Sequence, residues 1–395
     1  MLNAGKHPCR FVARHSVSPI ALFPCVQHDS LCIRYLTKAQ DINFILASMP
    51  ENQPDVIGWG IVGCGWVARD YVAPAIAASG NGQLVALCDL SEQALAAVQP
   101  TDTTLHRTTS LADFVQTPGL QAVYVATPND HHARITQELA AAGLPVLCEK
   151  PLARTAAEAA GMVAAAEVAG TLLATAFDQR FHPAHVRLRE LIRSGALGRV
   201  TCVRIHYACW TPADWAPETD RGTYQNWRVS VEQAGGGAMI DLAPHGLDLV
   251  QTLLNEPLTA VAALTQQRIH DYPVDDGAVL IGQTTSGVLF SQAVAYNCPD
   301  QFPRRTLEVI GDQGRALAVN TMGQTPGGSL TLTHTDGTVE EIAFDAHASP
   351  FQRQVEAFAE AVRSGQPFPF PPARDLHTMH LLDLAAAKSQ ELLAL

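Results

Sequence analysis

The sequence predicts an α/β protein: a doubly wound parallel sheet comes first, and an α/β domain with a large, mostly antiparallel, open sheet follows. Up to about residue 176, short apolar runs alternate with alanine-rich helical segments. Such runs are typical of strands buried on both faces of a parallel sheet. After about residue 198, apolar and polar residues alternate within the runs, and glycine-containing turns separate them. That pattern is typical of antiparallel strands with one exposed face.

The first half contains five predicted strands with helices between them. The strands are expected at 56–62, 84–88, 122–126, 145–148 and 171–176. The helices are expected at 91–98, 131–142 and 155–169. Gly143 directly follows the second of these helices, as a helix-ending glycine does. This alternation of strand and helix predicts a doubly wound domain.

The second half contains further strands around one central helix. The strands are expected at 200–207, 278–284, 288–295, 306–309 and 329–335. The helices are expected at 238–254, 351–363 and 374–393. We expect the first domain to end at residue 176 and the second to begin at residue 177.

The first 54 residues lack clear periodicity, and basic residues outnumber acidic ones before Met49. A secretory signal needs a continuous apolar core, and the run 20–23 is too short and lies between Pro19 and Pro24. A transit peptide stays open, although no clean amphipathic pattern is present. We expect residues 1–54 to be an extension that is disordered or not translated, with Met49 as a candidate start.

Composition narrows the class of protein. Apolar residues make up 47% and charged residues 16%, as in a globular chain. The net charge of −12 would repel a polyphosphate backbone, so nucleic acid is not an expected partner. The nine cysteines form no C-x-x-C pair, which favours a reducing, cytoplasmic setting. No apolar run approaches the roughly 18 to 20 residues of a membrane span, so no membrane partner is expected.

The segment 63–68, directly after the first predicted strand, reads G-x-G-x-x-A. Small residues there allow a tight turn and a close approach of backbone to a pyrophosphate. Asp89 ends the second strand, where a carboxylate accepts hydrogen bonds from a ribose diol and repels a 2′-phosphate. The next basic residue is Arg107, so NAD is favoured and NADP stays possible. The alternative is an ordinary turn, with Asp89 as a helix cap. The residues expected to contact the cofactor are Gly63, Gly65, Trp66, Val67 and Asp89.

Several later motifs occur in a fixed order along the chain. They are Thr127-Pro128-Asn129, His131-His132, Cys148-Glu149-Lys150-Pro151, Arg180-Phe181-His182-Pro183, 194–198 and 235–245. Together with the glycine-rich segment, they resemble the glucose–fructose oxidoreductase/inositol dehydrogenase (Gfo/Idh/MocA) superfamily over roughly residues 55 to 395. The resemblance implies a dinucleotide-binding Rossmann domain at 55–176. It also implies a domain at 177–395 that binds substrate and forms homo-oligomers, a dimer or a tetramer, through its open sheet.

The resemblance also implies roles for individual residues. Lys150 would contact both the nicotinamide ribose and a substrate hydroxyl, and Glu149 would position it. His245 would act as the general base, and Asp241 would orient His245 or bind substrate. Arg180 would line the substrate cleft. The further residues implied to line the cofactor are Thr127, Pro128, Asn129, His132, Trp227 and Arg228.

These residue types suit the oxidation of a secondary alcohol. A neutral histidine takes a hydroxyl proton near neutral pH, and a lysine ammonium stabilises the developing alkoxide. Asp241 and His245 are four residues apart, so a helix places them on one face as a base and its orienting carboxylate, unless Pro244 kinks that helix. The same pair could be a surface contact. It could also bind metal, but no third ligand has a diagnostic spacing, so no metal is expected.

We therefore expect an oxidoreductase that transfers a hydride between nicotinamide and a sugar, cyclitol or related polyol. Three alternatives stay open. One is an NAD-dependent glycosidase that oxidises its substrate transiently. Another is a cofactor-sensing regulator without catalysis, which the presence of Lys150, Asp241 and His245 argues against. The last is reduction of a different carbonyl or a conjugated system, as in biliverdin reductase relatives.

Overall fold

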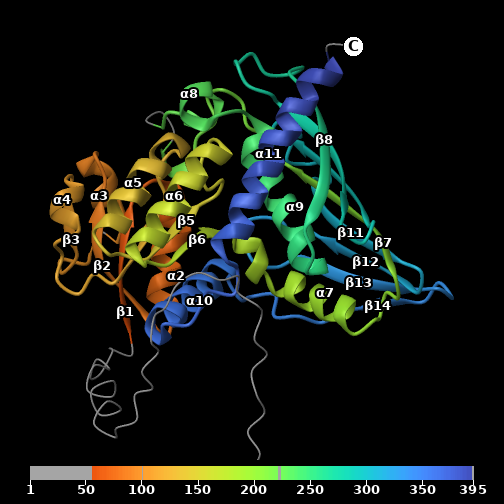
Figure 1. Ribbon diagram of the computed structural model, residues 1–395, viewed down its shortest axis with the longest axis horizontal. Coiled ribbons are helices and arrows are strands. Elements are labelled where there is room, and N and C mark those ends of the chain that lie inside the picture. The colour runs from red at the N-terminus through yellow and green to blue at the C-terminus, as the bar shows by residue number, and fades with distance from the viewer. Residues whose placement is uncertain (1–55, 100, 221–223, 394–395) are drawn as a thin grey trace, which may run out of the picture. The chain divides into compact units, whose positions relative to one another are not determined.

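A computed structural model describes residues 56–99, 101–220 and 224–393 (Figure 1). The extension expected at 1–54 lies outside these residues, so nothing tests it. The described chain contains two sheets, one of six strands and one of eight. This confirms the fold class that the sequence predicts.

The first sheet is parallel throughout, with the strand order β3-β2-β1-β4-β5-β6. Its strands are β1 (Ile57–Val62), β2 (Gly82–Cys88), β3 (His106–Thr108), β4 (Ala122–Val125), β5 (Val146–Glu149) and β6 (Leu173–Ala176). The order reverses between β1 and β4, and ligands bind outside the carboxyl ends of the strands at such a point. The five predicted strands are confirmed. The short β3 is polar and half-buried, so no apolar run marked it.

Local sequence signals determine where the helices around this sheet begin and end. The elements are a π-helical turn η1 (Ala68–Val72), α2 (Ala73–Ala78), α3 (Glu92–Ala97), α4 (Leu111–Phe114), α5 (Asn129–Ala141) and α6 (Ala156–Ala169). The side chains of Ser91, Ser110 and Thr155 each accept a hydrogen bond from a backbone N–H three residues further on. Such caps satisfy backbone donors that the first helical turn leaves free. The α6 helix ends at Gly170, whose φ of 67° favours glycine.

The second sheet has the order β14-β13-β12-β11-β7-β10-β9-β8. Its strands are β7 (Val200–Ala208), β8 (Leu258–Gln266), β9 (Gly277–Thr284), β10 (Leu289–Ala295), β11 (Arg305–Gly311), β12 (Gly314–Val319), β13 (Ser329–His334) and β14 (Val339–Glu341). All neighbours are antiparallel except β7 and β10, which run parallel. The predicted, mostly antiparallel sheet is therefore confirmed, and the structure adds β8, β12 and β14.

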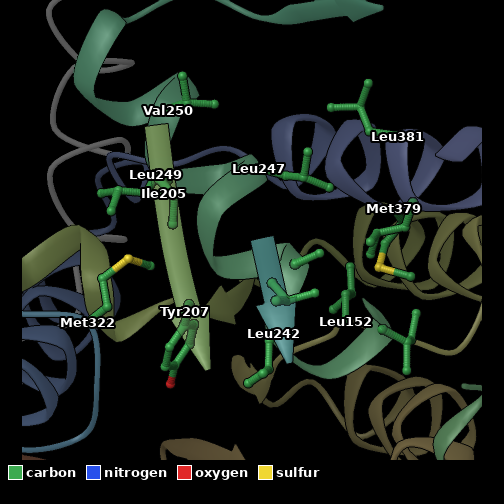
Figure 2. Packing of buried hydrophobic residues seen from close by; sticks show 14 of the residues in the cluster. Leu152, Ile205, Tyr207, Leu242, Leu247, Leu249, Val250, Met322, Met379 and Leu381 are labelled. Atoms are coloured by element: carbon green, nitrogen blue, oxygen red, sulfur yellow. The ribbon is translucent and has the colours of Figure 1, made fainter. Parts of the chain in front are cut away.

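One face of this sheet is covered by helices α7 (Pro183–Arg193), α9 (Ala238–Leu254) and α11 (Pro372–Leu393). Figure 2 shows side chains of β7, such as Ile205 and Tyr207, packed near Leu242 and Leu247 of α9. The α9 helix continues through Pro244, and nearly all its residues are buried. Burial of this apolar face holds the helix in place despite the missing backbone donor.

The chain returns to the first sheet near its end. Helix α10 (Pro350–Ser364) lies beside α2 (Figure 1), and Phe358 packs on Trp59 of β1 with ring centroids 5.6 Å apart. Phe351 and Val355 belong to the same buried cluster as Ile61. The sequence-based boundary assigned α10 to the second domain, and the exact domain boundaries stay a prediction.

Candidate active site

A cavity of about 290 Å³ lies where the loops after β1, β4, β5 and β6 face β7 and α9. That volume is close to the lower limit for small-molecule sites. The predicted residues that line it are Trp66, Val67, Thr127, Asn129, Glu149, Lys150, Trp227, Arg228, Asp241 and His245. The cavity therefore begins at the reversal of strand order, as expected for this sheet topology.

The glycine-rich loop after β1 is shaped by two glycines. Gly63 has a φ of 89°, and a Cβ there would lie 2.7 Å from the carbonyl carbon of Ala126. Only glycine allows this close packing between the loops after β1 and β4. A Cβ at Gly65 would have no heavy atom within 4 Å, so the loop presents bare backbone to open space, as an approaching pyrophosphate requires.

Asp89 braces that loop. Its Oδ2 accepts a hydrogen bond from the backbone N–H of Cys64 at 2.7 Å, and its Oδ1 accepts one from Ser91 at 2.8 Å. Ser91 itself caps α3, so Asp89 is not the cap that the alternative interpretation assigned to it. Each carboxylate oxygen keeps a further lone pair for a ligand.

The loop after β4 carries Thr127, Pro128 and Asn129, and α5 starts at Asn129. The Asn129 side chain donates to the carbonyl of Ala234 at 2.9 Å. His132 does not line the cavity, which corrects its predicted role. Its two ring nitrogens lie 3.0 Å from the carbonyl oxygens of Thr127 and Pro151, and the residue is fully buried. It joins the loops after β4 and β5.

Lys150 follows β5 and reaches α9. Its Nζ donates to Asp241 Oδ1 at 2.6 Å and to the Asp241 carbonyl at 3.1 Å. Glu149 accepts from the Lys150 backbone N–H at 3.1 Å and from the Tyr124 hydroxyl at 2.6 Å. Glu149 therefore fixes the backbone of Lys150, and Asp241 fixes its ammonium group.

Asp241 is committed to Lys150 and its neighbours. Its Oδ2 accepts a hydrogen bond from the Tyr296 hydroxyl at 2.8 Å and lies 3.9 Å from Arg228 Nε. Burial opposes its negative charge, but Lys150, Arg228 and Tyr296 together hold the pKa of Asp241 below its usual value. Asp241 is therefore an ionised partner of the ammonium.

His245 has a different neighbour from the one predicted. No hydrogen bond joins it to Asp241, whose carboxylate Lys150 and Tyr296 occupy, which corrects the predicted base–orienter pair. The carboxylate beside its Nδ1 belongs to Asp178, with 3.8 Å between Nδ1 and Oδ1. Burial, with Lys150 and Arg305 nearby, lowers the pKa of His245. The imidazole is therefore neutral near neutral pH, as a general base must be.

Arg180 does not line the cavity, which corrects its predicted role in substrate binding. It is 2% exposed, and its guanidinium binds Asp248 with N–O distances of 2.7 and 2.9 Å. It also binds Asp375 of α11. A charge this deeply buried is stable only when paired, and the pairing leaves Arg180 facing away from the cavity.

Aromatic rings form one wall of the cavity around Arg228. The guanidinium carbon of Arg228 lies 4.5 Å from the Trp227 ring centroid, 5.7 Å from that of Trp66 and 5.8 Å from that of Trp215. Its Nη1 donates to the Tyr224 hydroxyl at 2.8 Å. The bulky Trp66 of the glycine-rich loop thus forms part of this wall.

The sequence did not single out three residues that line the cavity, Asp178, Tyr207 and Arg305, nor Tyr296, which contacts Asp241. Arg305 lines the cavity with its guanidinium carbon 5.8 Å from the Tyr207 ring centroid. Its Nε is buried, and its guanidinium makes no hydrogen bond or ion pair within the described part of the chain. Asp178 comes shortly after the strand predicted at 171–176. A polar residue just beyond the carboxyl end of a parallel strand is a candidate ligand-binding residue, and this signal could have identified Asp178.

The ionisable groups in the cavity can support the transfer of a proton to or from a substrate oxygen atom. A neutral imidazole and a lysine ammonium lie on the same cavity, one able to accept a proton and the other to stabilise an oxyanion. Within residues 56–99, 101–220 and 224–393, no group of three His, Cys, Asp or Glu side chains could hold a metal ion. In the same residues, no helix is long and apolar enough to cross a bilayer.

Two family models match consecutive parts of the chain. Residues 57–177 match the family model described as "Oxidoreductase family, NAD-binding Rossmann fold", and residues 185–317 match the "GFO/IDH/MocA C-terminal domain". The chain is similar to 1,5-anhydro-D-fructose reductase of Ensifer adhaerens, with 33% identity over 78% of this chain and 89% of that protein.

Solved structures share the whole fold. The aldose-aldose oxidoreductase of Caulobacter crescentus, in complex with glycerol, has a TM-score of 0.74 and 23% identity over 85% of this chain and 98% of that chain. Levoglucosan dehydrogenase, in complex with NADH and levoglucosan, has a TM-score of 0.73 and 20% identity over 85% and 97%. At these identities, the similarity shows the fold alone.

Proposed function

The chain belongs to the GFO/IDH/MocA family of NAD-binding oxidoreductases, and we propose that it transfers a hydride between a nicotinamide dinucleotide and a sugar, cyclitol or related polyol. The main support is the pairing of Lys150 and neutral His245 on one cavity at the carboxyl ends of β1, β4 and β5. The similarity to a 1,5-anhydro-D-fructose reductase over most of both chains supports a sugar as substrate.

The loops fit a dinucleotide. Gly65 leaves room for the pyrophosphate, Gly63 lets its loop pack closely against the loop after β4, and Asp89 has lone pairs for a ribose diol. We propose NAD as the preferred cofactor, because Arg107 is not free to bind a 2′-phosphate. Its guanidinium donates to backbone carbonyls of residues in 95–105, among them those of Val98, Gln99 and Asp102.

This preference is tested by fluorescence titration with NADH and NADPH. The wild-type protein should bind NADH more tightly. Asp89→Asn, which removes one negative charge, should shift the ratio of the two dissociation constants toward NADPH by about fivefold. An unchanged ratio would mean that Asp89 does not face the adenosine ribose.

When bound, the nicotinamide accepts the hydride from the carbon that is oxidised. His245 accepts the hydroxyl proton, and Lys150 stabilises the negative charge on the oxygen as the proton leaves. Glu149 and Asp241 act on Lys150, because they hold its backbone and its ammonium. In the reductive direction, His245 returns the proton to the carbonyl oxygen.

We propose that Arg305 binds the end of the substrate that is distant from the reacting carbon. Its neighbour Arg304 pairs with Asp300, whereas Arg305 has no ion pair within the described residues. A guanidinium donor that is buried without an acceptor is unfavourable by about 1–3 kcal/mol. A substrate oxygen at this place would supply that acceptor.

The deciding experiment follows reduced nicotinamide absorbance against a panel of sugars, cyclitols and anhydro-sugars in both directions. Wild type should turn over at least one member. Lys150→Ala and His245→Ala should lose turnover but keep cofactor affinity. Binding without turnover of any member would favour a cofactor-sensing regulator.

Two enzymatic alternatives are separated by the same assay. Release of an aglycone without net reduced cofactor would favour a glycosidase with transient oxidation. Turnover of a conjugated system alone would favour a reductase of the biliverdin reductase type.

We also propose that the exposed face of the second sheet is a contact between copies of this chain. Four large apolar side chains share that face and are each more than half exposed: Leu264, Val279, Ile281 and Leu289. Contiguous exposed apolar residues of this kind mark protein contacts. Light scattering of wild type and Ile281→Lys would test it, because a monomeric wild type would rule it out.

A further inference from the structure

We propose that Asp178, rather than Asp241, is the positioning residue of His245, and that it selects the imidazole tautomer able to act as a base. This inference rests on the proposed function, because it assumes that His245 exchanges a proton with the substrate. No family motif or helical spacing points to Asp178. It follows from the contacts of two segments that meet in the cavity.

His245 has one ring nitrogen in need of a partner. Its Nδ1 is buried and makes no hydrogen bond with any described residue. It lies 3.8 Å from Oδ1 of Asp178, which also lines the cavity. Hydrogen bonds of catalytic groups are often long in the absence of ligand and shorten when the complex forms. A small approach of the two side chains would close this one.

Asp178 is held so that one oxygen stays available. It is the first residue of the 3₁₀ turn η2 (Asp178–Phe181), directly after β6 and Phe177. Its Oδ2 accepts a hydrogen bond from Gln179 Nε2 at 2.8 Å, and the same amide donates to the carbonyl of Gly323 at 3.0 Å. Oδ1 is therefore fixed toward the imidazole.

The other nearby carboxylate, that of Asp241, is already bound to residues other than His245. Asp241 uses Oδ1 for Lys150 and Oδ2 for Tyr296. The ring of His245 is further confined by Phe177 and Tyr207, whose rings contact it edge-on with centroids 6.3 and 5.4 Å away. Rotation of the imidazole away from Asp178 would break both contacts.

The chemical consequence is a choice of tautomer. When Nδ1–H donates to Asp178, Nε2 carries a lone pair and accepts the hydroxyl proton. The O–H bond would break and an Nε2–H bond would form, and a bound nicotinamide would supply the oxidant by taking the hydride from carbon. The resulting imidazolium is stabilised by the Asp178 carboxylate. A histidine held in the opposite tautomer cannot accept this proton.

The charged groups around Asp178 and His245 influence whether each of these two residues is protonated. Asp178 faces Glu149 and Lys150 as well as His245, and His245 also faces Lys150, Asp241 and Arg305. Burial, reinforced by Glu149, raises the pKa of Asp178 to about 7. Asp178 therefore gains its charge as the pH rises through about 7, so activity should rise over the same interval.

The test uses Asp178→Asn in the full-length protein. The amide has nearly the same size, but its NH₂ group would donate to Nδ1 and force the wrong tautomer. We expect kcat to fall at least about 100-fold, with substrate KM within about threefold of wild type and cofactor affinity unchanged. The rise of kcat through about pH 7 should disappear. Asp241→Asn serves as a comparison: it removes the charge that Lys150 binds but leaves Asp178 intact, so that rise should stay in place.

A second measurement does not require turnover. Long-range ¹H–¹⁵N correlation on histidine-labelled protein distinguishes the two neutral tautomers, and His245→Gln identifies the signal. Wild type should show Nδ1–H, and Asp178→Asn should show Nε2–H. The inference is overturned if the tautomer is unchanged in the variant, or if kcat and its pH profile are unchanged while His245→Ala is inactive. If His245→Ala keeps full activity, the proposed function of His245 fails first.

Discussion

Two clusters of charged side chains in this protein contain similar groups but have different surroundings. The cleft cluster consists of Lys150, Asp178, Arg228, Asp241, His245 and Tyr296, and all but Tyr296 line the cavity. The sealed cluster consists of Arg180, Asp248, Arg374 and Asp375, and none of these lines the cavity. Residue type alone does not separate them, because each contains cations paired with aspartates.

The difference is whether the charged groups reach a cavity that a ligand can enter. In the sealed cluster, Arg180 bridges Asp248 and Asp375, and Asp375 also accepts from the Thr175 backbone N–H at 2.8 Å. This joins α9 and α11 to β6. In the cleft cluster, His245 Nδ1 has no hydrogen bond, and its pKa is lowered by burial. We infer that the sealed cluster serves stability and the cleft cluster serves chemistry.

The largest effect on activity is expected for Lys150→Met. The substitution keeps much of the side-chain volume but removes the ammonium that binds Asp241. We expect kcat/KM to fall about 10³-fold, because oxyanion stabilisation is lost, with the cofactor dissociation constant within about threefold. Steady-state kinetics and fluorescence titration measure both. A loss below about tenfold would remove Lys150 from the reaction.

The largest effect on stability is expected for Arg180→Met. It leaves Asp248 and Asp375 buried without their shared cation, and breaking a buried pair in this way destabilises by about 3–5 kcal/mol. Chemical denaturation measures the change. Arg187→Met on the exposed side of α7 is the matched control, since its pair with Glu190 lies at the surface and should be worth at most about 1 kcal/mol. Equal effects of the two variants would contradict the comparison.

A third arginine, Arg305, also tests the difference between the cleft cluster and the sealed cluster. Arg305→Met should raise substrate KM roughly 10- to 100-fold, which corresponds to the loss of a charged hydrogen bond. It should leave the free energy of unfolding within about 0.5 kcal/mol, because no ion pair is broken within the described residues. Arg304→Met should change KM less, because Arg304 already pairs with Asp300. If Arg305→Met destabilises as Arg180→Met does, Arg305 belongs with the sealed groups.

The smallest effect is expected for Tyr296→Phe. Its hydroxyl donates to the ionised Asp241 at 2.8 Å. A hydrogen bond to a charged group contributes about 1.5–3 kcal/mol, and only part of this affects the reaction because Tyr296 acts through Asp241. We expect kcat/KM to fall about fivefold. The pKa of Asp241 should rise toward its usual value, because one donor to the carboxylate is lost. Unchanged kinetics would show that Lys150 alone determines the state of Asp241.

Much of the architecture could be predicted from the order of residues. Continuous apolar runs marked five of the six parallel strands, and the glycine-rich segment marked the loop after β1. Two of the missed strands lack such runs: β3 is short and polar, and β14 is exposed throughout. The strands β8 and β12 were also missed, although buried apolar residues alternate in both. The return of α10 to the first sheet left no local signal, because its amphipathic pattern does not say which surface it covers.

The candidate site was predicted only in part. The position of Lys150 and His245 on one cavity agrees with the motifs around them. The partners of these residues were not predictable. Helical spacing suggested Asp241 for His245, but Lys150 occupies that carboxylate. The motif around Arg180 suggested the cleft, but two distant aspartates hold it in the interior.

The sequence by itself determined the fold class, the two kinds of sheet, the dinucleotide loop and the chemical groups available for the reaction. Those features depend on periodicity, small residues and motifs, which act over a few neighbouring positions. Only the tertiary structure decided which carboxylate faces His245 and which arginine is sealed away. Those outcomes depend on contacts between segments far apart in the chain, where burial makes every unpaired charge unfavourable and so selects one set of partners.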